Sequence, residues 1–251
     1  MIEALLLLGG AAQAGEVDVA TDETAIGIDG SIEASIANTT GNTETLNAGL
    51  AGKLNYERLR YTHNLNAAAN YVETGAAGGG DRDTTAQNFF VSYQLDIDIS
   101  DESFAYGRVR YEQDKFSGYD QRVFAGLGYG HHIFETDELN WRVTAGPGLR
   151  WVETAQPNSP NAEPGRSMTE LSGYAASEFE WDVRENVGVE HDFTVTYTAA
   201  NTTLETEAGL KTKLTELLSA RLSYYVRHET TPALDREPTD TRLRAGIVVD
   251  F

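Results

Sequence analysis

Apolar and polar residues alternate along most of this chain with a period of two. Between residues 204 and 214, leucine, threonine and alanine occupy the even positions, and glutamate, glycine and lysine occupy the odd ones. This alternation is typical of a β-strand with one apolar face. The pattern recurs and predicts twelve strands, at residues 27–38, 43–57, 60–73, 85–99, 103–115, 121–135, 139–153, 168–183, 187–199, 202–215, 219–230 and 240–251.

The connections between the predicted strands differ systematically in length. Those after even-numbered strands are tight, at residues 58–59, 100–102, 136–138, 184–186 and 216–218. The longest follow odd-numbered strands, although 39–42 and 199–201 are also short. An even strand count with long loops at one end is typical of outer-membrane barrels, and a soluble sandwich has no reason to sort its loops. We therefore expect an all-β fold over residues 27–251, a twelve-stranded antiparallel up-and-down transmembrane β-barrel.

Tryptophans lie near the ends of predicted strands and always on the apolar face. Trp141 and Trp151 are ten positions apart in one strand, which is about 33 Å of extended chain and, at a tilt of roughly 40°, about 25 Å of height. That height matches the apolar band between the aromatic girdles of a membrane barrel. We expect Trp141, Trp151, Trp181 and Phe251 at the membrane interface, in contact with outer-membrane lipid and lipopolysaccharide.

The last predicted strand is amphipathic and ends in an aromatic residue. Between residues 243 and 251, apolar side chains alternate with arginine, glycine, valine and aspartate, and the final residue is Phe251. This ending resembles the C-terminal signal by which bacterial outer-membrane barrels are recognised for insertion. It therefore implies the barrel-insertion machinery as a partner.

Composition narrows the classes of function. The net charge is −20 and the pI is near 4.5, which argues against nucleic acid because phosphate binding needs a basic surface. Cysteine is absent, which excludes disulfides and cysteine catalysis. The mean hydropathy of −0.39 is compatible with a membrane barrel, because only half of the residues in each strand face lipid.

The first residues have features of an export signal. An apolar run at residues 5–8 precedes a small-x-small cleavage site at 12–14, which predicts a signal peptide over residues 1–14 and a short periplasmic segment over 15–26. A disordered tail is the alternative, because Glu3 has the wrong charge and no basic residue precedes the apolar run. Together with the predicted barrel, this export signal leads us to expect the chain in the bacterial outer membrane.

Several stretches together resemble one family. "NTTGNTETLNAGLAGKLNYER", "FAYGRVRYEQDKFSGYDQRVFAGLGYG", "AGPGLRW" and "PTDTRLRAGIVVDF" are similar, in this order, to the YdiY-like, salt-induced outer-membrane proteins of Gram-negative bacteria. The resemblance runs from about residue 26 to 251. It implies an outer-membrane barrel with a domain of unknown function, a link to salt or osmotic response, and no established catalytic residues.

If the polar face lines the barrel, its charges form arcs. The predicted basic residues are Arg108, Arg110, Arg142, Arg150, Arg221, Arg227, Arg242 and Arg244, and the predicted acidic residues are Glu178, Glu180, Asp182, Glu190, Asp192, Glu205 and Glu207. Such arcs can orient polar solutes as charged rings do in pores. Alternatively, the opposite charges pair across the lumen and plug it.

Glycines on the inward face suggest a second feature. Gly126, Gly128 and Gly130 precede Gly146 and Gly148 in the next predicted strand, and pairing across the turn sets them opposite one another. Glycine is unfavourable in a strand unless something approaches the backbone closely. We expect either a smooth patch with room for arginines or an anionic ligand, or glycines that ease the curvature of the barrel. Pro147 cannot donate to a ladder, so a bulge is expected there.

Other chemistry finds little support in the sequence. His131 and His132 are adjacent in a strand, so they point to opposite faces and cannot chelate one metal together. We expect no cofactor, no metal site and no enzyme activity, because no nucleophile, histidine and orienting group stand out as a set. The leading hypothesis is a narrow channel or binding barrel for small polar or charged solutes. The alternative is a sealed structural or adhesion barrel.

Overall fold

The computed structural model describes residues 26–39, 43–76, 82–114, 116, 119–154, 167–233 and 236–251. The predicted signal peptide, and the periplasmic segment up to residue 25, lie outside these ranges and stay predictions. Within the described ranges the chain contains no helix long and apolar enough to cross a membrane.

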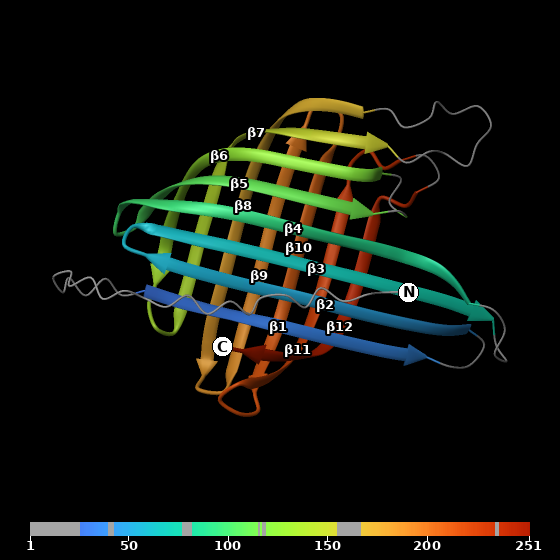
Figure 1. The fold of residues 1–251 in the computed structure, drawn as a ribbon, viewed down its shortest axis with the longest axis horizontal. Coiled ribbons are helices and arrows are strands. Elements are labelled where there is room, and N and C mark those ends of the chain that lie inside the picture. The colour runs from blue at the N-terminus through green and yellow to red at the C-terminus, as the bar shows by residue number, and fades with distance from the viewer. Residues whose placement is uncertain are drawn as a thin grey trace, which may run out of the picture.

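Twelve antiparallel strands form one closed barrel, in which each strand pairs with its neighbours in sequence and β1 pairs with β12 (Figure 1). The strands are β1 (Ile26–Thr39), β2 (Thr43–Arg58), β3 (Tyr61–Ala76), β4 (Arg82–Ser100), β5 (Ser103–Asp114), β6 (Tyr119–Glu135), β7 (Leu139–Thr154), β8 (Ser167–Arg184), β9 (Val187–Thr198), β10 (Thr202–Lys213), β11 (Leu218–Glu229) and β12 (Thr239–Asp250). The alternation in the sequence predicted all twelve and their order. The predicted fold class is confirmed.

The side chains of this barrel are sorted in the opposite way to those of a soluble protein. In β4, Phe89, Tyr93 and Ile99 are 38, 41 and 63% exposed, whereas Ser92 and Asp96 are 1 and 3% exposed. On the other strands as well, apolar side chains cover the outside, and most of the buried inward side chains are polar. An exterior of this kind is stable only against hydrocarbon, so the strands span a membrane.

The barrel closes along a short ladder between its first and last strands. β1 and β12 pair only from Ser31↔Asp250 to Ala34↔Ile247, and Gly30 and Phe251 exchange backbone hydrogen bonds of 2.9 and 3.0 Å just below. Figure 1 shows the two strands together near the C-terminus and diverging from there. A Cβ on Gly30 would lie 2.7 Å from Cζ of Phe251, so the terminal ring packs against the glycine and covers this end of the seam.

The prediction of a bulge at Pro147 is wrong. Gly126↔Gly148 and Tyr129↔Ala145 pair with the same offset on either side of Pro147, and the register shifts of this ladder lie elsewhere. The ladder is therefore interrupted without an inserted residue. Proline removes a hydrogen-bond donor, and the local gap in pairing accommodates that loss.

Glycine lets the two backbones approach closely beside this gap. A Cβ on Gly128 would lie 2.2 Å from the carbonyl oxygen of Ala145, and one on Gly146 would lie 2.1 Å from that of Leu127. No side chain fits at such distances. Gly128 and Gly146 are thus required by the contact between the two strands.

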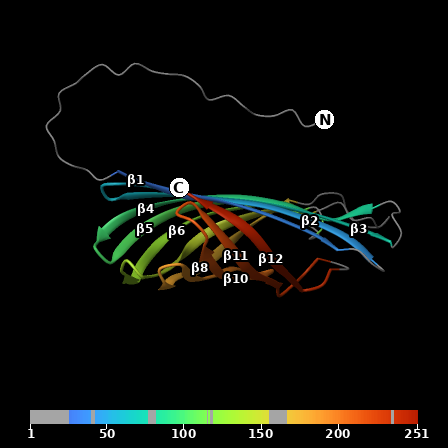
Figure 2. The ribbon, with the colours of Figure 1, turned by 90° about the horizontal axis from the view of Figure 1, so that it is seen from below.

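The barrel is flattened, as Figure 2 shows, so that opposite walls lie close together. In Figure 1 the strands of the near wall cross those of the far wall steeply. Long side chains from one wall can therefore reach the other, and this shape decides what the lumen contains.

The lumen as candidate functional site

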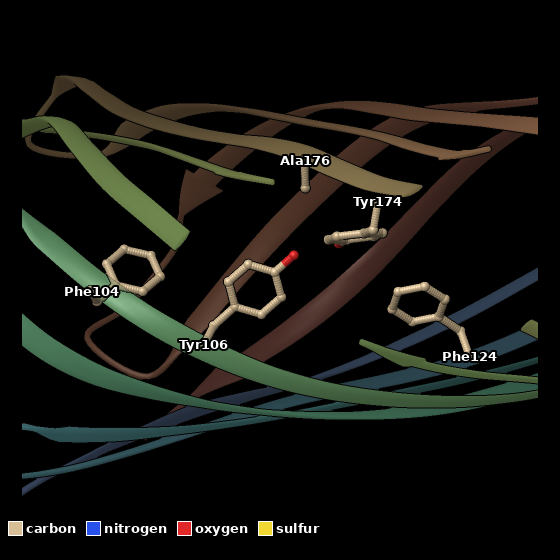
Figure 3. Packing of buried hydrophobic residues seen from close by; sticks show 5 residues of the cluster. All are labelled: Phe104, Tyr106, Phe124, Tyr174 and Ala176. Atoms are coloured by element: carbon tan, nitrogen blue, oxygen red, sulfur yellow. The ribbon is translucent and has the colours of Figure 1, made fainter. Parts of the chain in front are cut away.

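An aromatic cluster fills the side of the lumen formed by β5, β6 and β8. Phe104, Tyr106, Phe124, Tyr174 and Ala176 are each 1 to 7% exposed. Figure 3 shows the rings from β5 and β6 projecting toward Tyr174 and Ala176 on β8. The ring centroids of Phe124 and Tyr174 are 5.3 Å apart, and those of Tyr106 and Tyr174 are 6.3 Å apart. This is a packed apolar core inside a largely polar lumen.

The rings of this cluster lie directly over the predicted glycine patch. A Cβ on Gly126 would lie 2.5 Å from Cζ of Phe124, and one on Gly128 would lie 2.8 Å from Cε1 of Tyr106. Phe104 covers Gly130 in the same way. The glycines make room for aromatic rings rather than for the arginines or the ligand that the sequence suggested.

The sequence contained a signal for these rings that its analysis missed. Phe104 and Tyr106 share the parity of Arg108 in β5, and Phe124 shares that of Gly126 in β6. A large aromatic ring on the inward face can pack into the space that an inward glycine on the next strand leaves. The pattern could not predict that β8 lies close enough for Tyr174 and Ala176 to contact these rings, because that depends on the shape of the barrel.

Ion pairs next to the cluster cross the lumen from wall to wall. Arg110 on β5 lies 3.4 Å from Glu205 on β10, and Arg227 on β11 lies 2.5 Å from Glu112 on β5. Arg110 also reaches Glu112 at 3.4 Å. We call these four side chains the partition, because they connect β5 with β10 and β11 through the middle of the lumen.

The partition continues toward the end of the barrel that carries the longer loops. Glu229 accepts hydrogen bonds from Arg122 at 2.6 Å and from Arg227 at 3.0 Å, and Asn201 donates a further one. Glu229 is 8% exposed and Arg122 is 7% exposed. A buried carboxylate with several donors is held firmly, so this end of the partition is well fixed.

A cavity of about 940 Å³ occupies the other side of the partition. Its lining includes Asp29 and Asp250 near the tight turns, and Phe116 and Arg236 near the longer loops. The space therefore extends between both ends of the barrel. Its walls come from β1 to β6 and from β8 to β12.

Further ion pairs narrow this cavity without filling it. Arg221 contacts Glu33, Glu190 and Glu207 at 3.0, 2.9 and 2.9 Å. Lys53 on β2 faces Asp192 on β9 across the lumen at 3.9 Å. The Lys53 and Asp192 side chains are 46 and 38% exposed, so water reaches this pair and the contact is loose.

The remaining predicted charges take different places. Arg142 pairs with Glu178 and, at 3.2 Å, with Asp96. Arg244 donates to Asn70 at 2.6 Å. Asp182 lies 3.7 Å from Lys213 near the tight turns. Some charges of the predicted arcs thus pair across the lumen, and others pair along the wall with a nearby strand, so that most of the charge is compensated.

Four of the predicted charged residues have no oppositely charged side chain in contact within the described parts of the chain. They are Arg108, Arg150, Glu180 and Arg242. Three of them, Arg108, Glu180 and Arg242, line the large cavity. These free charges can act on a solute.

The three tryptophans lie near the ends of their strands. Trp141 and Trp181 are close to the tight turns, and Trp151 is close to the longer loops. Trp141 donates from its indole to Ser177 at 3.0 Å and stacks on Phe134. Tryptophan favours the boundary between hydrocarbon and water, so these positions suit an interface.

A metal site finds no support in the described ranges, where no group of three or more histidine, aspartate or glutamate side chains is arranged to hold an ion.

Comparison with known proteins gives a family. The family model described as "Protein of unknown function, DUF481" matches residues 32–251. The uncharacterized protein YdiY of Escherichia coli K12 is 26% identical over 147 residues, which are 58% of this chain and 55% of that protein. The match therefore spans about half the length of this relative.

Among solved structures, the NanC porin has a TM-score of 0.49 at 11% identity, over 89% of this chain and 98% of its own. An outer membrane channel from Pseudomonas putida F1 has a TM-score of 0.48 at 12% identity, over 94 and 100%. At these values the likeness concerns the barrel architecture alone.

Proposed function

Because the chain belongs to the family described as "Protein of unknown function, DUF481", whose description assigns no activity, we propose a function from the lumen itself. The barrel lies in the bacterial outer membrane and forms a narrow passage for small polar or charged solutes. The observation that carries this proposal is the cavity of about 940 Å³, whose lining reaches both ends of the barrel.

The passage suits small solutes, and cations more than anions. The partition and the aromatic cluster leave only one side of the lumen open, and Lys53 and Asp192 narrow that side. Acidic side chains outnumber basic ones among the residues that line the cavity. A pore wall with excess negative charge concentrates cations and repels anions.

Conductance in planar lipid bilayers tests the proposal. The wild-type barrel should give small, steady openings, and a KCl gradient should give a reversal potential on the cation-selective side. Glu180→Gln removes a free charge from the cavity wall and should lower the selectivity for K⁺ over Cl⁻. Asp182→Asn is the matched control, because Asp182 lies two positions further along β8 and does not line the cavity.

The alternative is a sealed structural or adhesion barrel. It is favoured by the ion pairs that cross the lumen and by the apolar cluster beside them. Folded wild-type protein that gives no openings in bilayers, and no uptake of small sugars or amino acids into liposomes, would establish the sealed barrel and overturn the passage. The salt response that the family resemblance implies is a separate expectation, tested by protein abundance at raised NaCl.

A further inference from the structure

A second, much smaller chamber lies behind the partition, between it and the aromatic cluster. It has a volume of about 50 Å³. Its lining is unusually basic, because it contains five arginines: Arg108, Arg110, Arg122, Arg150 and Arg227. The carboxylates in this lining are those of Glu112 and Glu205, and both belong to the partition.

The negative charge close to this chamber is already engaged. Glu112 and Glu205 pair with Arg227 and Arg110. Glu229, just outside the chamber, pairs with Arg122 and Arg227. The five arginines therefore carry more charge than the three carboxylates they contact.

Arg108 and Arg150 hold this excess. Within the described part of the chain, Arg150 donates only to the hydroxyl of Thr203, at 3.3 Å, and is 4% exposed. Arg108 donates to the side-chain oxygen of Gln94 at 3.1 Å and lies over the ring of Tyr174 at 5.1 Å. Neither contacts a carboxylate among the described residues. A buried guanidinium without a counter-charge is unfavourable, because it loses its hydration and gains no opposite charge in return.

Unused hydrogen-bond donors occur on the same residues. The Nε atoms of Arg108 and Arg150 and an Nη atom of Arg122 are buried and have no acceptor among the described residues. Native proteins pair nearly all such groups. Three unpaired donors on arginines that line one chamber indicate that an acceptor belongs there.

The size of the chamber limits what this acceptor is. One water needs about 10–15 Å³ on the scale of these volumes, so about 50 Å³ holds roughly three to five waters. A tetrahedral oxyanion or a compact carboxylate needs similar space. Guanidinium groups bind such anions through pairs of parallel hydrogen bonds, and the hydroxyls of Thr194, Thr196 and Thr203 border the same space.

We propose that this chamber binds one small oxyanion, such as phosphate, sulfate or a compact carboxylate, between Arg108, Arg122 and Arg150. The bound anion neutralises the excess positive charge and supports the partition from behind. The chamber adjoins the large cavity, because the two share the four partition residues and also Arg108, Arg122, Tyr174 and Thr194 in their linings, whereas Arg150 lines only the chamber. The anion therefore enters from the passage, by transient opening of the partition.

Calorimetric titration of the folded barrel with inorganic phosphate tests the site. The protein is held in phosphatidylcholine nanodiscs, in a zwitterionic buffer free of phosphate and sulfate. Wild-type protein should bind one phosphate per chain with a midpoint below 1 mM, a threshold that we set for the test. Sulfate should compete, and the neutral solute glycerol should not.

Matched variants locate the site. Arg150→Gln and Arg108→Gln should each weaken phosphate binding about tenfold or more. Arg242→Gln should leave it unchanged, because Arg242 also lacks a carboxylate partner in the described chain but lines only the large cavity. Circular dichroism and the heat-dependent shift in gel mobility verify that each variant is folded.

The outcomes separate this inference from the proposed function. No saturable phosphate binding by folded wild-type protein overturns the anion site, whatever the conductance. Equal weakening by Arg242→Gln overturns its location, because the anion would then bind in the passage. If Arg150→Gln fails to fold, thermal unfolding replaces it as the test. Phosphate should then raise the thermal midpoint of the wild-type protein but not that of Arg108→Gln, and a rise in neither or in both would overturn the site.

Discussion

The two sides of the lumen are formed by the same barrel and follow the same alternation of inward and outward residues, yet one side is filled and the other is open. On the filled side, aromatic rings from β5 and β6 pack onto glycines and meet β8. On the open side, short polar side chains and alanines of β2 and β3 leave a cavity of about 940 Å³. Residue size on the inward face, together with the flattened shape of the barrel, therefore decides where a solute can pass.

The partition separates these two sides, and its position explains its chemistry. Arg110, Glu112, Glu205 and Arg227 lie where the lumen changes from apolar packing to open space. Each charge has a partner from another wall, so the cost of removing it from water is offset by the pairing. The partition thus acts as a polar boundary between a core and a passage.

The largest expected effect comes from opening the filled side. Phe104→Ala removes a ring that is 1% exposed and should lower the free energy of unfolding by about 4 kcal/mol. It should also raise conductance by adding a second path. Urea titration in lipid vesicles measures the first effect and bilayer recording the second. Phe134→Ala is the control, because Phe134 is 49% exposed on the outer face; equal losses from both variants would contradict the packed cluster.

Breaking the partition should have the next largest effect. Among the described residues, Arg227→Gln leaves Glu112 with only Arg110 and Glu229 with only Arg122 as charged partners. Removing one member of a buried network should cost about 3 kcal/mol. Single-channel recordings should show larger and noisier openings. Unchanged stability and conductance would mean that these side chains do not bridge the lumen.

The glycine contact should give a smaller but sharply localised effect. Gly128→Ala places a methyl group 2.2 Å from a backbone oxygen and should destabilise the barrel by about 2 kcal/mol. Gly107→Ala is its control, because a Cβ there meets nothing within 4 Å. The comparison uses urea midpoints for the two alanine variants. Similar midpoints would remove the argument that β6 and β7 need glycine.

The smallest effect is expected in the open passage. Lys53→Gln breaks a long, half-exposed pair with Asp192 and should change stability by about 0.5 kcal/mol or less. It should nevertheless increase the selectivity for cations, because a positive charge leaves the cavity wall. Reversal potentials in a KCl gradient provide the measurement. An unchanged reversal potential would place Lys53 away from the conducting path.

Much of the fold was readable from the sequence because period-two alternation fixes both the strands and their faces. Arg108 and Asp192 were placed on the inward face by parity alone. Which charges pair could not be read, since the contact of Arg227 with Glu112 depends on the flattened shape of the barrel. The space beside the glycine patch was assigned to arginines or an anionic ligand because the aromatic rings of the adjacent strands, such as that of Tyr106, were not considered as its cover. The alternative, that these glycines ease the curvature of the barrel, stays a prediction. At Pro147, the expectation of a bulge overlooked a simple gap in pairing.

Accessibility of engineered cysteines tests the divided lumen most directly, because the chain has no cysteine of its own. Ala51→Cys lies in the wall of the large cavity, and Ala176→Cys lies in the aromatic cluster and is 6% exposed. We expect a charged methanethiosulfonate reagent to modify Ala51→Cys from either side of a bilayer and to reduce its conductance. Ala176→Cys should stay unmodified until the barrel unfolds. Rapid modification of Ala176→Cys in the folded barrel, or none of Ala51→Cys, would contradict the account.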